Sequence, residues 1–495
     1  MEGVTGDRAT ATRRPARMVS VTPPTASSLL SDVDSKQHAP AVVATRVPEA
    51  VRPVVGGLLR PDQVPWYEFG APDPLAHLLS RHLNRALLDP LHGGSALAEE
   101  WTMTGNRATF TLAEDGVWSD GTPLRAADIV TVLRREMGEG NLPGLQDVKA
   151  VDERTVEIVL APPACSSLVQ VATWPIVDAY EWMPTRVSGD VTVEEQGEER
   201  WVIEPDGFSY QAFPDELELR EAWEKGEINT VVGASRLTMG SLPGAWVPSE
   251  QAGPLLATLI FALNDSMLED DTLREALTLA TDRSALFADA YGFAPEHLPT
   301  ALLPPGHWAA PTEALPSSAK EAATLLSQAG WRDRDGDGIR ENEAGESLRL
   351  VLSIPMSHDH RWERLAKVLA EQWEAVGIQL SPLYLEAYML HERLHTDRWQ
   401  VALVAYTLAA DPDQRALWSE PTDLVGEDLN VTGYHNAEVA DLMIEGEQVP
   451  GCEIESRAAF YQEAWAQLLT ERPLWPLFVL PLDLVQRSGV EWPGE

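Results

Sequence analysis

An acidic loop with alternating aspartates stands out among the residues that could do chemistry. Residues 331–342 read WRDRDGDGIREN, and Gly338 stands where a calcium loop turns sharply. The oxygen ligands of such a loop would be Asp333, Asp335, Asp337, the carbonyl of Ile339 and Glu341. Position twelve is Ala344 instead of the usual bidentate glutamate, and Glu343 or Glu346 is the alternative ligand at this end of the loop. The loop predicts either a calcium ion that clips the structure or a solvated turn between two elements.

A second chemical motif is HERLH at residues 391–395. On a helix, His391 and His395 lie one turn apart and can hold zinc, with Glu392 as the general base of a metallohydrolase. Glu420 has the spacing of a third ligand, although an acidic chain offers many such carboxylates. The alternative is a pair of histidines at exposed helix positions. The sequence contains no G-x-S-x-G motif, phosphate loop or dinucleotide-binding fingerprint, so no other catalytic class is indicated.

The overall charge of the chain is strongly negative. Its 495 residues include 37 lysines and arginines against 77 aspartates and glutamates, a formal net charge of −40. Such a surface repels nucleic acid and anionic membranes and attracts cations, and solubility or adaptation to salt is the simpler explanation of the charge. The length predicts two or three domains, and no apolar run is long enough to span a membrane. Cys165 and Cys452 are the only cysteines, so one disulfide can form, and the sequence leaves open whether it does.

The first fifty residues lack hydrophobic periodicity and are rich in threonine, proline, alanine and arginine, which predicts a disordered tail over residues 1–54. The Arg13-Arg14 pair is not followed by an apolar stretch, and no lipobox cysteine is present. We therefore find neither a signal peptide nor a lipoprotein signal in the sequence as written.

Alternating helices and strands must position these motifs, which is typical of an α/β protein. The helices that we expect cover residues 73–88, a segment beginning at Thr122 and Pro123, 217–226, 272–291, 318–329, 362–376 and 455–471. The strands that we expect cover residues 108–112, 153–160, a hairpin over 190–204, 228–232, 255–263, 347–354 and 474–480. Thr122 is predicted as an N-cap, and Ser318 with Glu321 as a capping box.

Six segments in a fixed order resemble one protein family. They read LAEEWTMTGNRATFTLAEDGVWSDGTPLRAADIV (97–130), VKAVDERTVEIVL (148–160), LREALTLATDRSALF (273–287), AATLLSQAGWRDRDGDGIREN (322–342), TGYHNAEVADLM (432–443) and AFYQEAWAQLLTERPLWPLF (459–478). On these segments the chain is identified as a divergent member of the extracytoplasmic solute-binding proteins of the oligopeptide, dipeptide and nickel class, family 5, the receptor components of ABC importers. In this family the ERL of HERLH is ordinary helix sequence.

The resemblance implies a large, class II periplasmic-binding-protein-like α/β fold with an extra subdomain and a ligand cleft between two lobes. It places lobe one at residues 55–255, with 466–495 returning to it, and lobe two at 256–465. Such proteins are not enzymes and need no cofactor, and the acidic loop offers a site for structural calcium. The resemblance implies an extracytoplasmic monomer that passes a peptide or other small solute to a membrane permease, without nucleic acid. The alternative is a cytoplasmic ligand sensor or accessory domain on the same fold, motivated by the missing signal.

Aromatic walls with a few polar anchors are typical of such a ligand pocket. The candidates near the lobe junctions are Trp66, Tyr67, Asn264, Tyr406, Asp411, Trp418 and Tyr434. The alternative for each aromatic candidate is a place in the core, because the chain has 17 tryptophans. In the family, an aspartate after a buried strand holds the α-amine of a peptide, whereas here Ala409 or Ala410 occupies that position. An ammonium buried without its counter-charge is costly, so this departure disfavours a peptide ligand.

Overall fold

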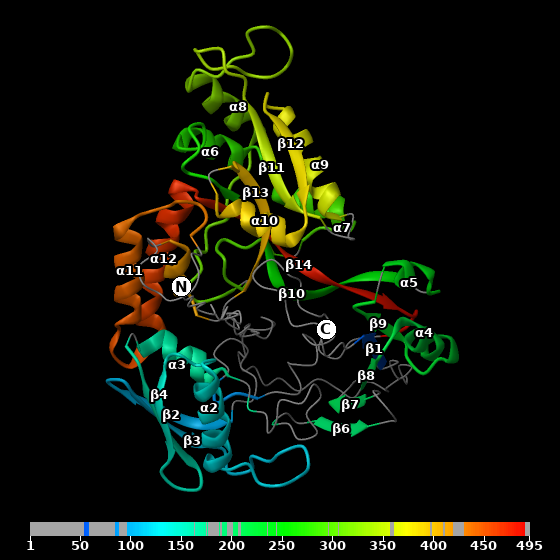
Figure 1. Ribbon diagram of the computed structural model, residues 1–495, viewed down its shortest axis with the longest axis vertical. Helices are drawn as coiled ribbons and strands as arrows, with labels where there is room; N and C mark the ends of the chain where they lie inside the picture. The colour runs from blue at the N-terminus through cyan, green and yellow to red at the C-terminus, as the bar shows by residue number, and fades with distance from the viewer. Residues whose placement is uncertain are drawn as a thin grey trace, which may run out of the picture.

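The computed structural model places a ten-stranded sheet and a separate four-stranded sheet, with helices around both (Figure 1). It describes residues 54–58, 85–88 and 97–490, except 163, 175, 177–187, 189–190, 196–200, 206–208, 235, 244, 296, 305, 357–360, 397, 409–410 and 419–429. The expected tail and most of the expected helix at 73–88 lie outside these residues.

Two long strands hold the ten-stranded sheet together. β10 (Ala245–Phe261) and β14 (Leu474–Gln486) are antiparallel neighbours that run from the upper body of the molecule to the lower right in Figure 1. On the upper side the sheet continues through β13 (Val401–Thr407), β11 (Arg349–Pro355) and β12 (Gln379–Leu385). On the lower side it continues through β9 (Thr230–Val232), β1 (Val54–Leu58), β8 (Ser209–Phe213), β7 (Trp201–Pro205) and β6 (Val191–Glu195). The sheet therefore continues from the upper body of the molecule into the lower one. The expected lobe boundary at residue 255 falls within β10.

The four-stranded sheet forms a third body, at the lower left of Figure 1. Its antiparallel strands lie in the order β2 (Ala98–Thr104), β3 (Arg107–Leu112), β5 (Thr155–Leu160) and β4 (Leu145–Ala150). The helices α2 (Ala126–Glu139) and α3 (Ala164–Ala172) complete this unit. Ile129, Val132 and Leu133 of α2 are buried in its core, as the apolar spacing of that helix predicts.

Seven further helices surround the upper half of the ten-stranded sheet. They are α6 (Asp271–Leu279), α7 (Arg283–Tyr291), α8 (Ala319–Gln328), α9 (Arg361–Glu374), α10 (Ala387–Leu394), α11 (Ala437–Glu447) and α12 (Ile454–Glu471), with two short 3-10 turns, η1 (Arg415–Leu417) and η2 (Pro450–Cys452). α4 (Glu216–Lys225) and α5 (Arg236–Ser241) lie beside the lower strands. α11 and α12 form a neighbouring pair on the left of the upper body (Figure 1).

Most expected elements are confirmed. The hairpin near 190–204 is β6 paired with β7, and the helix expected at 455–471 is α12. Ser318 caps α8, because its hydroxyl accepts a hydrogen bond from the backbone N–H of Glu321 at 3.3 Å. The apolar stripe of α9 is confirmed by the burial of Leu365, Leu369 and Trp373.

Two expected helices differ from the structure: one begins later than predicted, and one is divided in two. Thr122 does not cap a helix, because its hydroxyl donates to Asp120 at 2.6 Å within a turn, and Pro123 forms an isolated bridge with Val117. α2 begins later, where the carboxylate of Asp128 accepts a hydrogen bond from the N–H of Arg125 at 2.8 Å. The continuous helix expected at 272–291 is instead α6 followed by α7, because Asp282 caps a new helix with its side chain.

Candidate functional site

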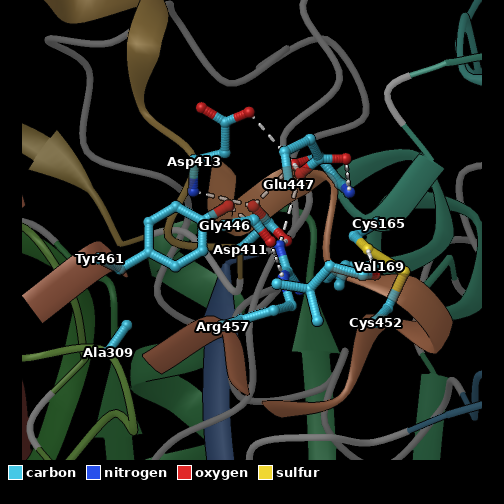
Figure 2. Close-up of polar contacts among 12 residues, drawn as sticks. Cys165, Val169, Ala309, Asp411, Asp413, Gly446, Glu447, Cys452, Arg457 and Tyr461 are labelled. Carbon is cyan, nitrogen blue, oxygen red and sulfur yellow. Dashed lines mark hydrogen bonds and ion pairs between the residues drawn. A yellow bond between two sulfur atoms is a disulfide. The ribbon is translucent and has the colours of Figure 1, made fainter. Parts of the chain in front are cut away.

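Asp411 lies in a group of charged side chains that we call the buried charge cluster: Asp411, Asp413, Arg415, Glu447 and Arg457. Figure 2 shows Asp411, Asp413, Glu447 and Arg457 of this cluster. The two aspartates follow β13, Glu447 ends α11, and Arg457 lies in the first half of α12. α11 and α12 approach closely at Gly446, where an added Cβ would lie 2.8 Å from the ring of Tyr461. Close packing of this helix pair brings Glu447 and Arg457 together on its inner side.

Arginine side chains balance most of the negative charge in the cluster. Arg457 Nη2 lies 3.1 Å from Asp411 Oδ2 and 3.4 Å from Glu447 Oε2, and Arg415 pairs with Asp413 at 2.5 Å. The side chains of Arg457 and Glu447 are 2% and 0% exposed, so these groups have lost their water. Three carboxylates against two guanidinium groups leave one negative charge in excess. Accordingly, burial raises the pKa of the Glu447 carboxyl, and the nearby charge of Asp411 raises it further.

Ser166 brings the four-stranded unit into this cluster. Its backbone N–H donates to Glu447 Oε1 at 2.6 Å, and its hydroxyl lies 2.9 Å from Asp411 Oδ1 and 2.5 Å from Glu447 Oε2. A hydroxyl carries one proton, so it can donate to only one of these carboxylates at a time. Beside it, Cys165 of α3 forms a disulfide with Cys452 of η2, which settles the pairing that the sequence left open (Figure 2). A covalent bond and several polar contacts thus join α3 to neighbouring parts of the chain, the bond to η2 and the contacts to the end of α11 and to Asp411.

The contacts of the cluster hold two parts of the chain together. Asp411 accepts from Arg457 through Oδ2 and from the N–H of Asp413 through Oδ1, which also lies 2.9 Å from the Ser166 hydroxyl. Both of its oxygens are therefore engaged within the protein. The guanidinium of Arg457 also faces the rings of Trp308 and Tyr461, at 5.5 and 5.3 Å from their centroids.

The other predicted ligand-binding residues occupy different environments. Trp418 and Tyr434, each 2% exposed, meet edge to face with centroids 6.1 Å apart inside one core, where Trp465 also contacts Trp418. Tyr406 is half-buried against this core, and Asn264 is exposed. Trp66 and Tyr67 lie outside the described residues, as do Ala409 and Ala410. A ligand-binding role for these residues stays a prediction.

Sequence reasoning missed Ser166, Asp413, Arg415, Glu447 and Arg457. A signal for Arg457 was present, because the buried side of α12 consists of Arg457, Tyr461, Ala464, Trp465 and Leu468 at helical spacing. A charged residue in an apolar stripe requires a buried partner. Nothing in the spacing identifies Ser166 as a member, since it lies 281 positions from Glu447.

The acidic loop brings four of its five predicted ligands together. Oxygen atoms of Asp333, Asp335, Asp337 and Glu341 all lie within 4.8 Å of one another. The three aspartates are exposed and Glu341 is buried. Ile339 lies between Asp337 and Glu341 in the sequence. Its side chain is 8% exposed, and its N–H donates to Asp337 Oδ1 at 2.8 Å.

Comparison with known proteins decides the family. The model for bacterial extracellular solute-binding proteins, family 5, matches residues 94–201 and 201–420. The chain belongs to this family. It is 25% identical to the oligopeptide-binding protein AppA of Bacillus subtilis over 217 residues, which cover 42% of this chain and 38% of AppA. It is 22% identical to the periplasmic oligopeptide-binding protein OppA of Escherichia coli over 454 residues, covering 78% and 79% of the two chains.

Solved structures support the same fold. The structure of NikZ from Campylobacter jejuni in complex with Ni(L-His) matches with a TM-score of 0.57 at 16% identity, covering 88% of this chain and 94% of NikZ. The family 5 solute-binding protein therefore has the two-lobed α/β fold that the sequence predicts. None of the helices in the described part of the chain has both the length and the apolar character needed to cross a membrane.

The HERLH segment does not assemble a metal site within the part of the chain that the structure describes. His391 lies on α10 and His395 caps its end, with ring centroids 4.4 Å apart. His395 Nδ1 lies 2.8 Å from the carbonyl oxygen of His391, one turn back on the same helix. The only described group of three or more candidate ligands is the acidic loop, and Glu420 lies outside the described residues. The relatives are named as binding proteins, which agrees with a protein that is not an enzyme.

Proposed function

We propose that this chain is the receptor component of an ABC importer, which traps a peptide or other small solute between two lobes and delivers it to a membrane permease. The observation that carries this proposal is the match of the family 5 model across residues 94–420. The arrangement of β10 and β14 supports it, because two strands crossing between the upper and lower bodies can act as a hinge.

The mechanism is a shift of population. A solute that contacts both lobes only when they are closed binds the closed state better and increases its share. We assign the four-stranded unit to lobe one and the α11–α12 pair to lobe two. The contact of Ser166 with Asp411 and Glu447 then lies between lobes, and the Cys165–Cys452 disulfide ties them at the same edge. In this arrangement the hinge axis passes through both the β10–β14 crossing and the tied edge, and the lobes open about that axis.

The ion pair of Asp411 with Arg457 disfavours one class of solute, peptides with a free amino terminus. A peptide with a free amino terminus needs a counter-charge for its buried ammonium, and Asp411 already pairs with Arg457. We therefore expect the solute to bind without an ammonium held at Asp411. Oligopeptides and Ni(L-His) are the ligands named for the similar proteins above, and they are the first ligand classes to test for binding.

An extracytoplasmic location is part of the proposal. Disulfides persist mainly in oxidising compartments outside the cytoplasm, and the Cys165–Cys452 bond joins residues 287 positions apart. The names of the relatives, periplasmic in the case of OppA, point the same way.

The test is a thermal-shift screen of the full chain with matched ligands. Each peptide is offered with a free and with an acetylated amino terminus, beside Ni(L-His) and other small solutes. We expect a saturable rise in melting temperature with at least one solute, and the same rise for both forms of any peptide that binds. A strong preference for the free amine would overturn the solute class. Failure of every solute, with no compaction in small-angle scattering, would count against the receptor function itself.

A further inference from the structure

The acidic loop closes a small hairpin in place of joining two helices. Arg332 and Glu341 exchange backbone hydrogen bonds of 2.9 and 2.8 Å, and Glu341 also bridges to Ser347. The backbone frame therefore fixes Glu341 directly opposite the residue that precedes Asp333. This geometry brings the carboxylate at loop position nine into the group of aspartates without any residue from position twelve.

Backbone amides inside the loop direct the aspartate oxygens inward. Asp333 accepts from the N–H groups of Gly336 and Gly338 at 2.7 and 3.2 Å, and both glycines have positive φ angles, of 82° and 90°. Each ionised carboxylate has about four lone-pair positions, so these bonds leave acceptor capacity for an ion. Arg349 lies 3.1 Å from Asp337 and is the one arginine paired with these four carboxylates in the described ion pairs.

The buried carboxylate of Glu341 is a second, independent indication of a bound cation. Its side chain is buried, at 6% exposure, and its Oε2 accepts from the N–H of Arg334 at 2.8 Å. Its Oε1 is buried and has no hydrogen-bond partner among the described residues. A buried carboxylate oxygen without a partner costs free energy, on the order of 1–3 kcal/mol or more. A cation held among Glu341 and the three aspartates supplies the missing partner and separates four like charges.

We propose that this hairpin binds one Ca²⁺ ion through Asp333, Asp335, Asp337 and Glu341, with the carbonyl of Ile339 as a further ligand. Glu341 takes the place of the bidentate glutamate that Ala344 cannot provide. Ca²⁺ fits this all-oxygen set better than Mg²⁺, which demands near-ideal octahedral geometry and keeps several waters. Because the aspartates are exposed, we expect a dissociation constant of about 10⁻⁴–10⁻³ M, as in extracellular calcium modules. The ion pins the turn between α8 and β11.

Isothermal titration of the full chain with CaCl₂ tests this site. It is done at physiological salt, where diffuse attraction of Ca²⁺ to an acidic surface is screened. Wild-type protein is expected to bind one Ca²⁺, and Glu341→Gln to lose at least about tenfold in affinity. Glu343 is an alternative ligand by sequence, but it is exposed and is not among the four carboxylates that gather in the loop. Glu343→Gln is therefore the matched control: it removes the same charge two positions away and is expected to bind as wild type.

A second variant keeps the test valid if Glu341→Gln fails to fold. Asp335→Asn preserves an oxygen that accepts the N–H of Asp337, a bond of 3.0 Å, while it removes one ligand charge from an exposed position. Binding weakened by Asp335→Asn and not by Glu343→Gln supports the site. Wild-type stoichiometry well below one, or equal binding by wild type and Asp335→Asn, overturns it. Neither result depends on the solute, so failure here leaves the receptor function untouched.

Discussion

Two groups of acidic side chains in this protein are stabilised in opposite ways. In the buried charge cluster, arginines and a serine from another unit surround Asp411, Asp413 and Glu447. In the acidic loop, backbone amides of the loop itself and one surface arginine contact the carboxylates. The charges of the cluster are buried among other residues and need partners inside the protein. The three aspartates of the loop, in contrast, are exposed and can be satisfied by water or by an ion that also reaches the buried Glu341. The first group therefore holds parts of the fold together, and the second is suited to a cation.

The largest effect is expected when the cluster loses Arg457. Arg457→Met leaves Asp411 and Glu447 buried without their cation, which should lower the free energy of unfolding by about 3–5 kcal/mol. Urea denaturation monitored by tryptophan fluorescence measures this loss. The matched control is Arg364→Met, which breaks the exposed pair with Asp289 and should leave stability nearly unchanged. Equal losses in the two variants would remove the distinction between buried and exposed acidic groups.

The disulfide beside the cluster should have the next largest effect. Replacing Cys165 and Cys452 together by serine releases the long loop between them and should cost about 2–4 kcal/mol of unfolding free energy. It should also let the solute-free protein open further, because the tied edge is released. Small-angle scattering of the solute-free variant should then give a larger radius of gyration than the wild type. An unchanged radius would show that Ser166 and its partners hold this edge without the covalent bond.

The buried Glu447 carboxyl should make the stability of the protein depend on pH, unlike an exposed carboxylate. Burial raises the pKa of this carboxyl above its ordinary value of 4.5, so the folded protein holds the proton more tightly than the unfolded chain. The stability from this group is full below the unfolded pKa and is lost as pH rises through the raised folded pKa. Glu447→Gln has no such proton, so the wild type should lose stability relative to this variant as pH rises from the unfolded value of 4.5 through the raised folded pKa. A difference that stays constant with pH would show that burial does not perturb Glu447.

The smallest effect is expected in the acidic loop. Asp335→Asn with Asp337→Asn keeps oxygens that accept the N–H groups of Asp337 and Ile339. In EDTA the double variant should differ from wild type by no more than about 0.5 kcal/mol. With millimolar Ca²⁺ only the wild type should gain melting temperature, while solute affinity should be nearly equal in both. A large loss of solute affinity would place the loop close to the ligand.

Local patterns predicted much of the fold, because capping residues and apolar spacing act over a few positions. Ser318 and the buried face of α9 are examples. Local reasoning failed at Thr122, where an Asp120 turn competes for the hydroxyl, and at Asp282, where a capping aspartate divides one apolar pattern into two helices. The site was harder to predict because Ser166 meets Glu447 only in the folded chain. The gathering of the four loop carboxylates was predictable, since these residues are neighbours in sequence.

The central claim is that this family 5 protein closes its lobes on a solute. The most direct measurement is small-angle scattering of the full chain with and without the solute that gives the largest thermal shift. We predict a smaller radius of gyration at saturation, reached at the same concentrations as the thermal shift. Identical scattering with and without a saturating solute would contradict closure about β10 and β14.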